Sequence, residues 1–411
     1  MHVRKVAITG LGVVSPVGND VPTFWNNIKN GVCGVDFITR FDTEDFKVKV
    51  AAEVKGFDPL SCLEKPEVRK MDLYCQYAMS AAKQAVEDSG IVGAVDPTRL
   101  GVYVGSGIGG MSTFVSETQK LLEKGPRRVS PFFIPMMIGN IAAGNIAIKY
   151  GAKGPSLPVV TACATSTNTV GEAYRAIKHG YADAIIAGGA EATITPLAVA
   201  GFTSCMALST RNVPKEASIP FDKRRDGFVM GEGAGILVLE EYEHAKARGA
   251  KIYGLLCGYG NTCDAYHVTA PQPEAEGASA ALRLAMEEAE YTGGDTVYLN
   301  AHGTSTPLND RVETLAVKKA FGSAAADVHI SSTKSMTGHM LGAAGAVEAI
   351  AAALSLGEGI VPPTIGYQEP DPDCDLNYTT GGAVKAPISV AFSSSLGFGG
   401  HNAVIAIRGE N

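Results

Sequence analysis

Apolar residues form two kinds of segment along this chain. Short runs rich in Val, Ile and Ala predict buried strands, and longer stretches with apolar residues at every third or fourth position predict helices packed on one face. Strands are expected at residues 3–14, 100–106, 159–161, 182–187, 228–239, 255–260, 297–302, 329–332, 388–394 and 403–408. Helices are expected at residues 21–30, 71–89, 136–150, 275–290, 310–321 and 341–356, with one more between residue 163 and Gly180.

The order of these segments predicts a layered α/β protein that contains an internal duplication. A strand, then small residues, then a long helix occurs at residues 157–180 and again at residues 329–357. A strand interrupted by glycines occurs at residues 228–239 and again at residues 391–408. We therefore expect two similar halves: residues 1–250 with Cys163, and residues 251–411 with His302, Lys334 and His339.

The composition is that of an ordinary globular protein, with 45% hydrophobic and 19% charged residues. The length of 411 residues predicts about two or three domain-sized units. The net charge of −7 argues against a nucleic-acid or membrane surface, so an acidic partner would need a local basic patch. No uncharged apolar stretch of 18 or more residues occurs, so no transmembrane helix is expected. The eight cysteines form no C-x-x-C pair and suit a reducing compartment, which predicts a cytoplasmic protein.

Cys163 follows a β-branched run and precedes small hydroxyl residues at the start of a long helix. At such a helix start, unpaired N–H groups and the positive end of the helix dipole stabilise a thiolate. A thiolate is the nucleophile that acyl transfer requires, so Cys163 is a candidate catalytic residue. A buried structural cysteine is the alternative that this stretch alone leaves open.

Three further reactive residues, His302, Lys334 and His339, follow predicted strands and stand among Gly, Ser and Thr. Ligands bind at this edge of open α/β sheets. A zinc site formed by Cys163 and the two histidines is an alternative, but the local ligand spacings of zinc sites are absent, so we expect no metal. Nucleotide binding by the glycine-rich residues 105–110 is another alternative, but that stretch matches neither G-x-G-x-x-G nor a P-loop.

Six ordered motifs carry the most specific information about function. They are Thr-Ala-Cys-Ala at 161–164, Ala-Leu-Ser-Thr-Arg-Asn at 207–212, Arg-Asp-Gly-Phe at 225–228, Asn-Ala-His-Gly-Thr-Ser-Thr-Pro at 300–307, Ser-Thr-Lys-Ser-Met-Thr-Gly-His at 332–339 and Gly-Phe-Gly-Gly at 397–400. By these motifs, which span nearly the whole chain, the protein resembles the elongating β-ketoacyl-acyl-carrier-protein synthases, most closely those of type II. One departure is Leu396, where that family usually carries Phe.

The resemblance implies a thiolase fold, with two duplicated halves in a five-layered α-β-α-β-α arrangement, and a homodimer. It also implies decarboxylative Claisen condensation, in which Cys163 accepts an acyl chain that malonyl-acyl-carrier protein extends by two carbons. His302 and His339 would stabilise the enolate, and Lys334 would supply a fixed positive charge. The N–H groups of Cys163 and Phe398 would hold the oxyanion, and Phe398 would gate the two half-reactions. No cofactor is implied beyond the phosphopantetheine arm of the carrier protein.

Further residues receive roles through the same resemblance. Asp310, Glu313 and Glu348 would support Lys334, unless they are ordinary charges on helix surfaces. Ile108 would line the acyl pocket, unless it is a core aliphatic residue that follows a turn. The acidic carrier protein would dock on basic residues, unless these form an ordinary solvated face. The docking residues would be Lys65, Arg69, Lys70, Arg127 and Arg128.

The motif residues also discriminate among related proteins. Two histidines with a lysine differ from the Cys-His-Asn set of the initiating synthases, and residues 399–402 lack the second cysteine of degradative thiolases. A polyketide or specialised-lipid ketosynthase with the same mechanism remains an alternative. A non-catalytic partner subunit that binds the carrier protein is an alternative from another class, against which an intact Cys163 argues.

Overall fold

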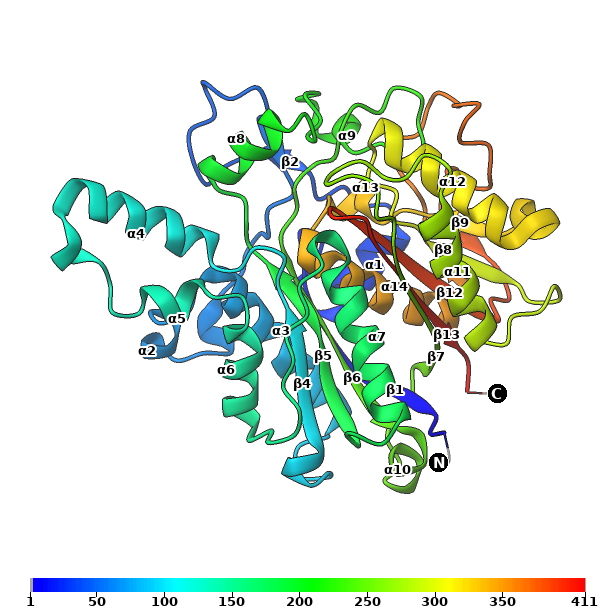
Figure 1. Ribbon diagram of the computed structural model, residues 1–411, viewed down its shortest axis with the longest axis horizontal. Coiled ribbons are helices and arrows are strands. Elements are labelled where there is room, and N and C mark those ends of the chain that lie inside the picture. The colour runs from blue at the N-terminus through cyan, green and yellow to red at the C-terminus, as the bar shows by residue number, and fades with distance from the viewer. Residues whose placement is uncertain (1–2, 411) are drawn as a thin grey trace.

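The structure, a computed structural model, describes residues 3–410. Its core is a mixed sheet of nine strands, hydrogen-bonded in the order β4-β5-β6-β1-β7-β13-β12-β8-β9 (Figure 1). These strands are β1 (Val6–Val14), β4 (Leu100–Gly105), β5 (Ala184–Glu191), β6 (Gly233–Glu241), β7 (Gly254–Cys263), β8 (Val297–Asn300), β9 (His329–Ser331), β12 (Val390–Gly397) and β13 (His401–Arg408). Two short pairs lie outside it: β2 (Asp36–Phe37) with β3 (Val50–Ala51), and β10 (Ile360–Val361) with β11 (Val384–Lys385).

Helices surround this sheet, and local capping residues explain where several of them begin and end. In the helix at residues 73–89, the Asp72 side chain accepts a hydrogen bond from the Tyr74 N–H, and Gly90 ends the helix in the left-handed conformation. The helices are α1 (Val21–Lys29), α2 (Lys65–Val68), α3 (Leu73–Ser89), α4 (Met111–Lys124), α5 (Phe133–Met137), α6 (Ile141–Tyr150), α7 (Thr165–Lys178), α8 (Pro196–Ser204), α9 (Pro214–Ala217), α10 (Tyr242–Ala247), α11 (Glu276–Glu288), α12 (Pro307–Phe321), α13 (Lys334–Thr337) and α14 (Ala344–Glu358).

The strand order is mirrored about the centre of the sheet. From the centre outward, β1, β6, β5 and β4 follow one another in the first half, and β7, β13, β12 and β8 do so in the second. Beyond β4 lies a single bridge between Ser156 and Val102, and beyond β8 lies β9. This symmetry confirms the predicted duplication. The limits of the two halves, residues 1–250 and 251–411, remain a prediction.

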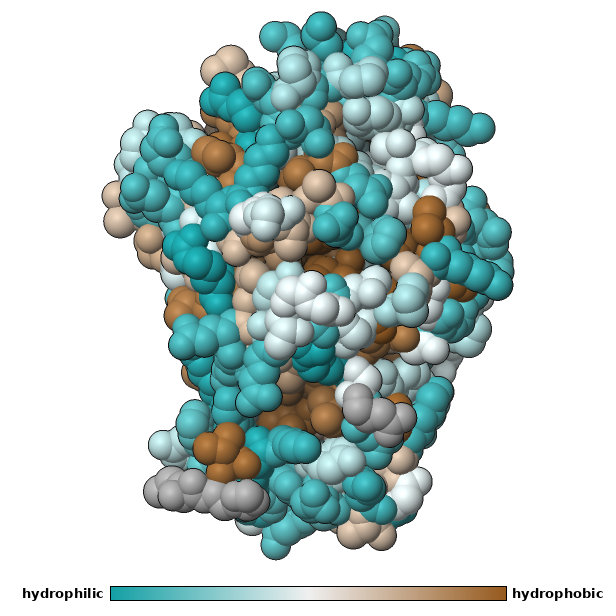
Figure 2. Space-filling model, turned by 90° about the vertical axis from the view of Figure 1, so that its right-hand side faces the viewer, coloured by the Kyte–Doolittle hydropathy of each residue, from teal (hydrophilic) through white to brown (hydrophobic). Residues whose placement is uncertain are grey.

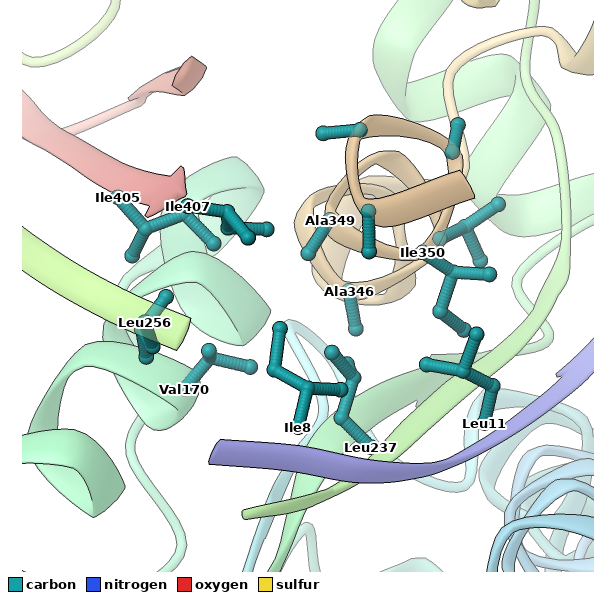
Figure 3. Close-up of a cluster of buried hydrophobic side chains, with 14 of the residues drawn as sticks. Ile8, Leu11, Val170, Leu237, Leu256, Ala346, Ala349, Ile350, Ile405 and Ile407 are labelled. Carbon is teal, nitrogen blue, oxygen red and sulfur yellow. The ribbon is translucent and has the colours of Figure 1, made fainter. Parts of the chain in front are cut away.

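Three hydrophobic clusters show that the fold is layered. One lies between α3 and the first half of the sheet, another between the second half and the pair α11 and α12, and the third encloses α7 and α14 between the two halves. Figure 3 shows Ile8 and Leu237 of the first half facing Ala346 and Ile350 of α14. Full burial of an Ile such as Ile8 contributes about 1.5–3 kcal/mol of stability. This is the five-layered α-β-α-β-α arrangement that the sequence motifs imply.

The central helix α14 is apolar on almost every side. Leu341–Glu358 is the one stretch of the described residues that is long and apolar enough to cross a membrane, but 78% of it is buried inside the protein. A helix enclosed between two sheets needs apolar side chains all round, so its core position explains this composition. Figure 2 shows the outer face over the second half, which is largely hydrophilic, with hydrophobic residues mainly in recesses.

The segment before Cys163 differs from its prediction. Residues 159–161 are not a buried strand, because Val160 is 57% exposed. The bridge to the sheet in this part of the chain is formed earlier, by Ser156. The β-branched residues therefore form no strand of the sheet. The helix predicted at residues 136–150 is also interrupted, because residues 138–140 separate α5 from α6.

The helix α4 was not predicted. It buries only Thr113 and Glu117, although its apolar residues Met111, Phe114, Val115, Leu121 and Leu122 follow helical spacing. Two of its large apolar side chains, Phe114 and Leu122, are exposed. In Figure 1, α4 projects from the left side of the molecule, well away from the sheet.

Candidate active site

Cys163 lies in the short 3₁₀ turn Ala162–Ala164, which leads directly into α7. Ala162 has a φ of 49°, a left-handed conformation that is rare for a residue with a side chain and is frequent at functional turns. The turn is held from α7, because Asn168 Nδ2 donates to Thr161 Oγ1 at 2.7 Å. The sequence therefore placed Cys163 correctly at the start of a long helix, although no strand precedes it.

A cavity of about 360 Å³ brings the predicted catalytic residues together. Cys163, His302, His339 and Phe398 all line it. It also contains polar side chains to which the sequence motifs had assigned no role. Three of them, Asp226, Thr304 and Thr306, lie inside those motifs, and the others are Asp264, Thr269, Asn309 and Asn402. Residues 3–410 hold no group of three His, Cys, Asp or Glu side chains placed to share a metal ion.

The two histidines lie side by side in the lining of this cavity. Their ring centroids lie 5.2 Å apart with the ring planes almost perpendicular, and His339 also packs edge-to-face on Phe228. Burial, and then the positive charge of Lys334, lower the pKa of both histidines well below the usual value. Both are therefore neutral near pH 7. Within the described chain, Nδ1 of His302 and both ring nitrogens of His339 have no hydrogen-bond partner, so the rings can donate N–H groups to a ligand.

Lys334 lies behind the histidines rather than in the cavity. It begins α13, its side chain is 1% exposed, and its Nζ forms an ion pair with Glu348 of α14. Burial raises the pKa of Glu348, and the neighbouring ammonium group partly offsets this effect. The pair therefore places a fixed positive charge beside the cavity, as the resemblance implies.

Asp310 and Glu313 hold other groups than Lys334. Glu313 accepts hydrogen bonds from the N–H groups of His302 and Gly303, each at 2.7 Å, and Asp310 accepts one from the Phe221 N–H at 2.8 Å. Burial raises the pKa of Glu313 to about 7 and also raises that of Asp310. Of the three acidic residues, Glu348 alone supports Lys334 directly. Asp310 and Glu313 lie on α12 and bind other groups. The alternative of surface charges is wrong for all three, which are at most 2% exposed.

The charge state of Cys163 differs from the expectation. Burial raises the pKa of the Cys163 thiol to about 11, although the Lys334 charge and the Phe398 N–H lower it. Desolvation therefore outweighs the helix start that was expected to stabilise a thiolate. The thiol carries its proton at neutral pH and must lose it as the reaction proceeds.

The segment that follows β12 approaches Cys163. The backbone N–H groups of Phe398 and of Cys163 itself lower the pKa of the Cys163 thiol, and the resemblance assigns the same two groups to the oxyanion. Gly397 permits this approach, because a Cβ there would lie 2.7 Å from the Thr161 carbonyl oxygen. Leu396, the one departure from the family motif, also lines the cavity. The gating and oxyanion roles of Phe398 remain predictions.

Ile108 occupies a loop beside this cavity without lining it. It is 39% exposed, so the alternative of a core aliphatic residue is wrong. The N–H groups of Gly107 and Ile108 donate to the Glu191 carboxylate at 2.9 and 3.3 Å. These donors of the glycine-rich loop are therefore not free to bind the phosphates of a nucleotide. Whether Ile108 lines the acyl pocket remains a prediction.

The five basic residues of the predicted docking surface are all exposed. Lys65 begins α2, and Arg127 and Arg128 form a turn after α4. The Lys70 ammonium lies 5.4 Å from the centroid of the Phe132 ring. This contact joins the segment of residues 65–70 to the loop of residues 126–132, so the two predicted docking segments are neighbours in space.

Comparisons with known proteins agree with this site. Residues 3–245 match the family described as Beta-ketoacyl synthase, N-terminal domain, and residues 253–368 match Beta-ketoacyl synthase, C-terminal domain. The chain is 53% identical to the 3-oxoacyl-[acyl-carrier-protein] synthase 2 of Staphylococcus aureus (strain COL) and 49% identical to that of Synechocystis, with 98% of both chains covered each time. A chain from a solved complex of a type II polyketide synthase acyl-carrier protein with its ketosynthase matches over the full length of both chains, at 36% identity and a TM-score of 0.91. The chain therefore belongs to the β-ketoacyl synthase family.

Proposed function

We propose that this chain elongates fatty acids by decarboxylative Claisen condensation of an acyl group on Cys163 with malonyl-acyl-carrier protein. The observation that carries this proposal is the convergence of Cys163, His302, His339 and Phe398 on one cavity. Two relatives named 3-oxoacyl-[acyl-carrier-protein] synthase 2 support it, since each covers 98% of this chain.

The first half-reaction transfers the acyl group to the enzyme. The Cys163 sulfur attacks the thioester carbonyl of the acyl-carrier protein, and the N–H groups of Cys163 and Phe398 hold the resulting oxyanion. The carbon–sulfur bond to the carrier then breaks, and the proton of Cys163 ends on the departing carrier thiol. The Lys334 charge lowers the pKa of Cys163 and so favours the loss of this proton.

The second half-reaction forms the carbon–carbon bond. Malonyl-carrier protein loses CO2, and the electron pair of the broken bond becomes an enolate at the thioester. The neutral rings of His302 and His339 donate hydrogen bonds to the enolate oxygen. The enolate carbon attacks the acyl thioester on Cys163, whose sulfur leaves as a thiolate that is then protonated. The product is a β-ketoacyl thioester longer by two carbons.

The partner in both steps is acyl-carrier protein, and the reaction needs no cofactor besides the phosphopantetheine arm that the carrier brings. The complex of a ketosynthase with an acyl-carrier protein, in a structure matched at a TM-score of 0.91, supports this partner. We place the reaction in the cytoplasm, because the cysteines are scattered without dithiol motifs. No nucleic acid or membrane takes part.

A homodimer is part of the proposal. The segment of residues 156–161 lies outside β4 at the edge of the sheet, with Leu157 48% and Val160 57% exposed. Ile134 and Ile148 on the neighbouring helices are 55% and 81% exposed. An unpaired edge flanked by exposed apolar side chains is suited to pairing with a second copy of the chain.

Mass spectrometry tests the proposed function directly. After incubation with acyl-carrier proteins of several chain lengths, the peptide that contains Cys163 should gain the mass of the acyl group. Subsequent malonyl-carrier protein should remove this mass and yield a β-ketoacyl product. A folded protein whose Cys163 accepts no acyl group would instead favour the non-catalytic partner subunit. Preference for a polyketide intermediate over a saturated primer would favour the polyketide alternative, which the 36% identical ketosynthase keeps open.

The Ile108→Phe substitution should shorten the range of accepted primers. If Ile108 lines the acyl pocket, the larger ring blocks long chains and spares short ones, with little change in melting temperature. The rate of Cys163 acylation against primer length measures this effect. Ile91→Phe is the control, because Ile91 is fully buried. Overpacking there should lower the stability of the protein by about 1–3 kcal/mol and so lower the acylation rate for every primer alike. A uniform fall in rate for Ile108→Phe, with a lower melting temperature, would contradict the assignment.

Added salt should raise the apparent KM for carrier-bound substrates, because exposed charges are screened beyond about 8–10 Å near 0.1 M salt. The variants Lys65→Glu and Arg69→Glu should raise that KM by about two- to fivefold at low salt. Decarboxylation of a small malonyl thioester should hardly change, since it needs no docking. Lys246→Glu on α10 is the control for a charge change elsewhere. Equal KM values for the docking variants and the parent across the salt series would remove these residues from the docking surface.

A further inference from the structure

Glu191 is a buried carboxylate that the proposed reaction does not use. It ends β5 and is completely inaccessible to solvent. Four donors converge on it: the Ser106 hydroxyl at 3.0 Å, and the N–H groups of Gly107 at 2.9 Å, Ile108 at 3.3 Å and Gly342 at 3.1 Å. Within the described chain, no cation pairs with it. The Glu191 carboxylate therefore accepts hydrogen bonds from one hydroxyl and three backbone N–H groups, and these bonds fix the positions of the donors.

The donors come from opposite halves of the molecule. Ser106, Gly107 and Ile108 follow β4 in the first half, whereas Gly342 follows the His339 segment of the second half. The two backbones approach so closely that a Cβ on Gly342 would lie 2.3 Å from the Gly107 nitrogen and 2.8 Å from the Glu191 carboxylate. Glu191 therefore ties the loop with Ile108 to the segment with His339 at a point where a side chain on Gly342 would clash with the Gly107 backbone.

This junction also lies next to the nucleophile. A Cβ on Gly107 would be 3.5 Å from the carbonyl oxygen of Ala162, the residue before Cys163. Burial raises the pKa of the Glu191 carboxyl to about 7, and its negative charge, once it is ionised, raises the pKa of the Cys163 thiol, opposite to the effect of Lys334. The carboxylate thus opposes thiolate formation. Any contribution of Glu191 to the site must therefore come from holding other groups in position, and not from activation of the sulfur.

We propose that Glu191 is a positioning residue that fixes the Ser106–Ile108 loop as a wall of the acyl site against the His339 segment. The inference rests on the proposed function, because it needs an acyl group on Cys163. Loss of the carboxylate would leave buried N–H groups unpaired, which costs about 1–3 kcal/mol for each group. The loop would then move away from Gly342, and the acyl site would lose its defined length.

The test compares Glu191→Gln with Glu240→Gln. Glu240 is as buried as Glu191. It lies at the other end of the paired strands β5 and β6, where its partner residue is Ala184. Acylation of Cys163 by short and long carrier-bound primers is measured for each protein. Glu191→Gln should change the ratio of long-primer to short-primer rates by about tenfold or more, as expected from one lost hydrogen bond to a charged group. Glu240→Gln should leave this ratio unchanged.

A second measurement separates position from charge. Alkylation of Cys163 by iodoacetamide as a function of pH should show a lower apparent pKa in Glu191→Gln, since Lys334 then acts without the opposing charge. Glu191→Asp keeps the charge but shortens the reach, so it should retain the alkylation profile of the parent and still alter the primer ratio. If Glu191→Gln fails to fold, Glu191→Asp alone carries the test of the primer ratio.

The outcomes distinguish this inference from the proposed function. A parent protein that accepts no primer on Cys163 would overturn the proposed function and leave nothing for Glu191 to position. A parent protein that accepts primers, together with Glu191 variants whose primer ratio equals that of Glu240→Gln, would overturn the role of Glu191 only.

Discussion

The Cys163→Ala variant is expected to lose condensation completely while it continues to release CO2 from malonyl-carrier protein. The two histidines that are proposed to bind the enolate line the cavity from separate elements. Within the described residues, Nδ1 of His302 and both ring nitrogens of His339 have no hydrogen-bond partner. Removal of the thiol therefore leaves the decarboxylation machinery in place. In contrast, His302→Ala or His339→Ala should lower CO2 release by about 10²–10³-fold, the usual effect of removing one oxyanion donor.

Release of CO2 and formation of the β-ketoacyl product, measured on each variant, test this division of labour. His179→Ala is the matched control, because His179 is exposed just after the end of α7 that lies farthest from Cys163. It should leave both activities unchanged. Loss of all CO2 release in a folded Cys163→Ala variant would show that the nucleophile and the histidines do not act independently.

Much of this site could be predicted because its residues follow regular elements. His302 follows β8, Lys334 follows β9, and Cys163 begins the long helix, so the edge of the sheet had to bring them close. The partners of the acidic residues could not be predicted in the same way. Asp310 and Glu313 lie on α12, and only the packing of that helix decides that Asp310 faces the Phe221 backbone and Glu313 the His302 loop, rather than Lys334.

The electrostatics of the site also depend on tertiary packing. The position of Cys163 at a helix start predicts a lowered pKa, whereas burial raises it to about 11. Glu191 had no signal at all in the sequence, because its four donors come from residues 106–108 and 342, far away along the chain. In the fold, the strand predicted at residues 159–161 was wrong, because a short β-branched run does not show whether a neighbour covers it. The helix α4 was missed, although its apolar residues follow helical spacing.

The Glu348→Ala variant is expected to lose about 3–5 kcal/mol of unfolding free energy. Lys334 and Glu348 have side chains that are 1% and 3% exposed, so the substitution leaves a buried ammonium group without its partner. Equilibrium denaturation measures the loss. Glu87→Ala removes an exposed Lys–Glu pair, with Lys83, and should cost only about 0.3–0.5 kcal/mol. A loss in Glu348→Ala no larger than that in Glu87→Ala would mean that the buried pair does not hold this part of the site.

A double variant identifies the cause of this instability. If the unpaired charge destabilises Glu348→Ala, then Lys334→Met in the same protein removes that charge, and the double variant should be more stable than Glu348→Ala alone. Condensation should nevertheless fall below that of Glu348→Ala in the double variant, because the positive charge that lowers the pKa of Cys163 is gone. Stability and activity would then respond in opposite directions to the same substitution. A double variant that is less stable than Glu348→Ala would indicate that packing of the two side chains, rather than their charges, stabilises α14 against α13.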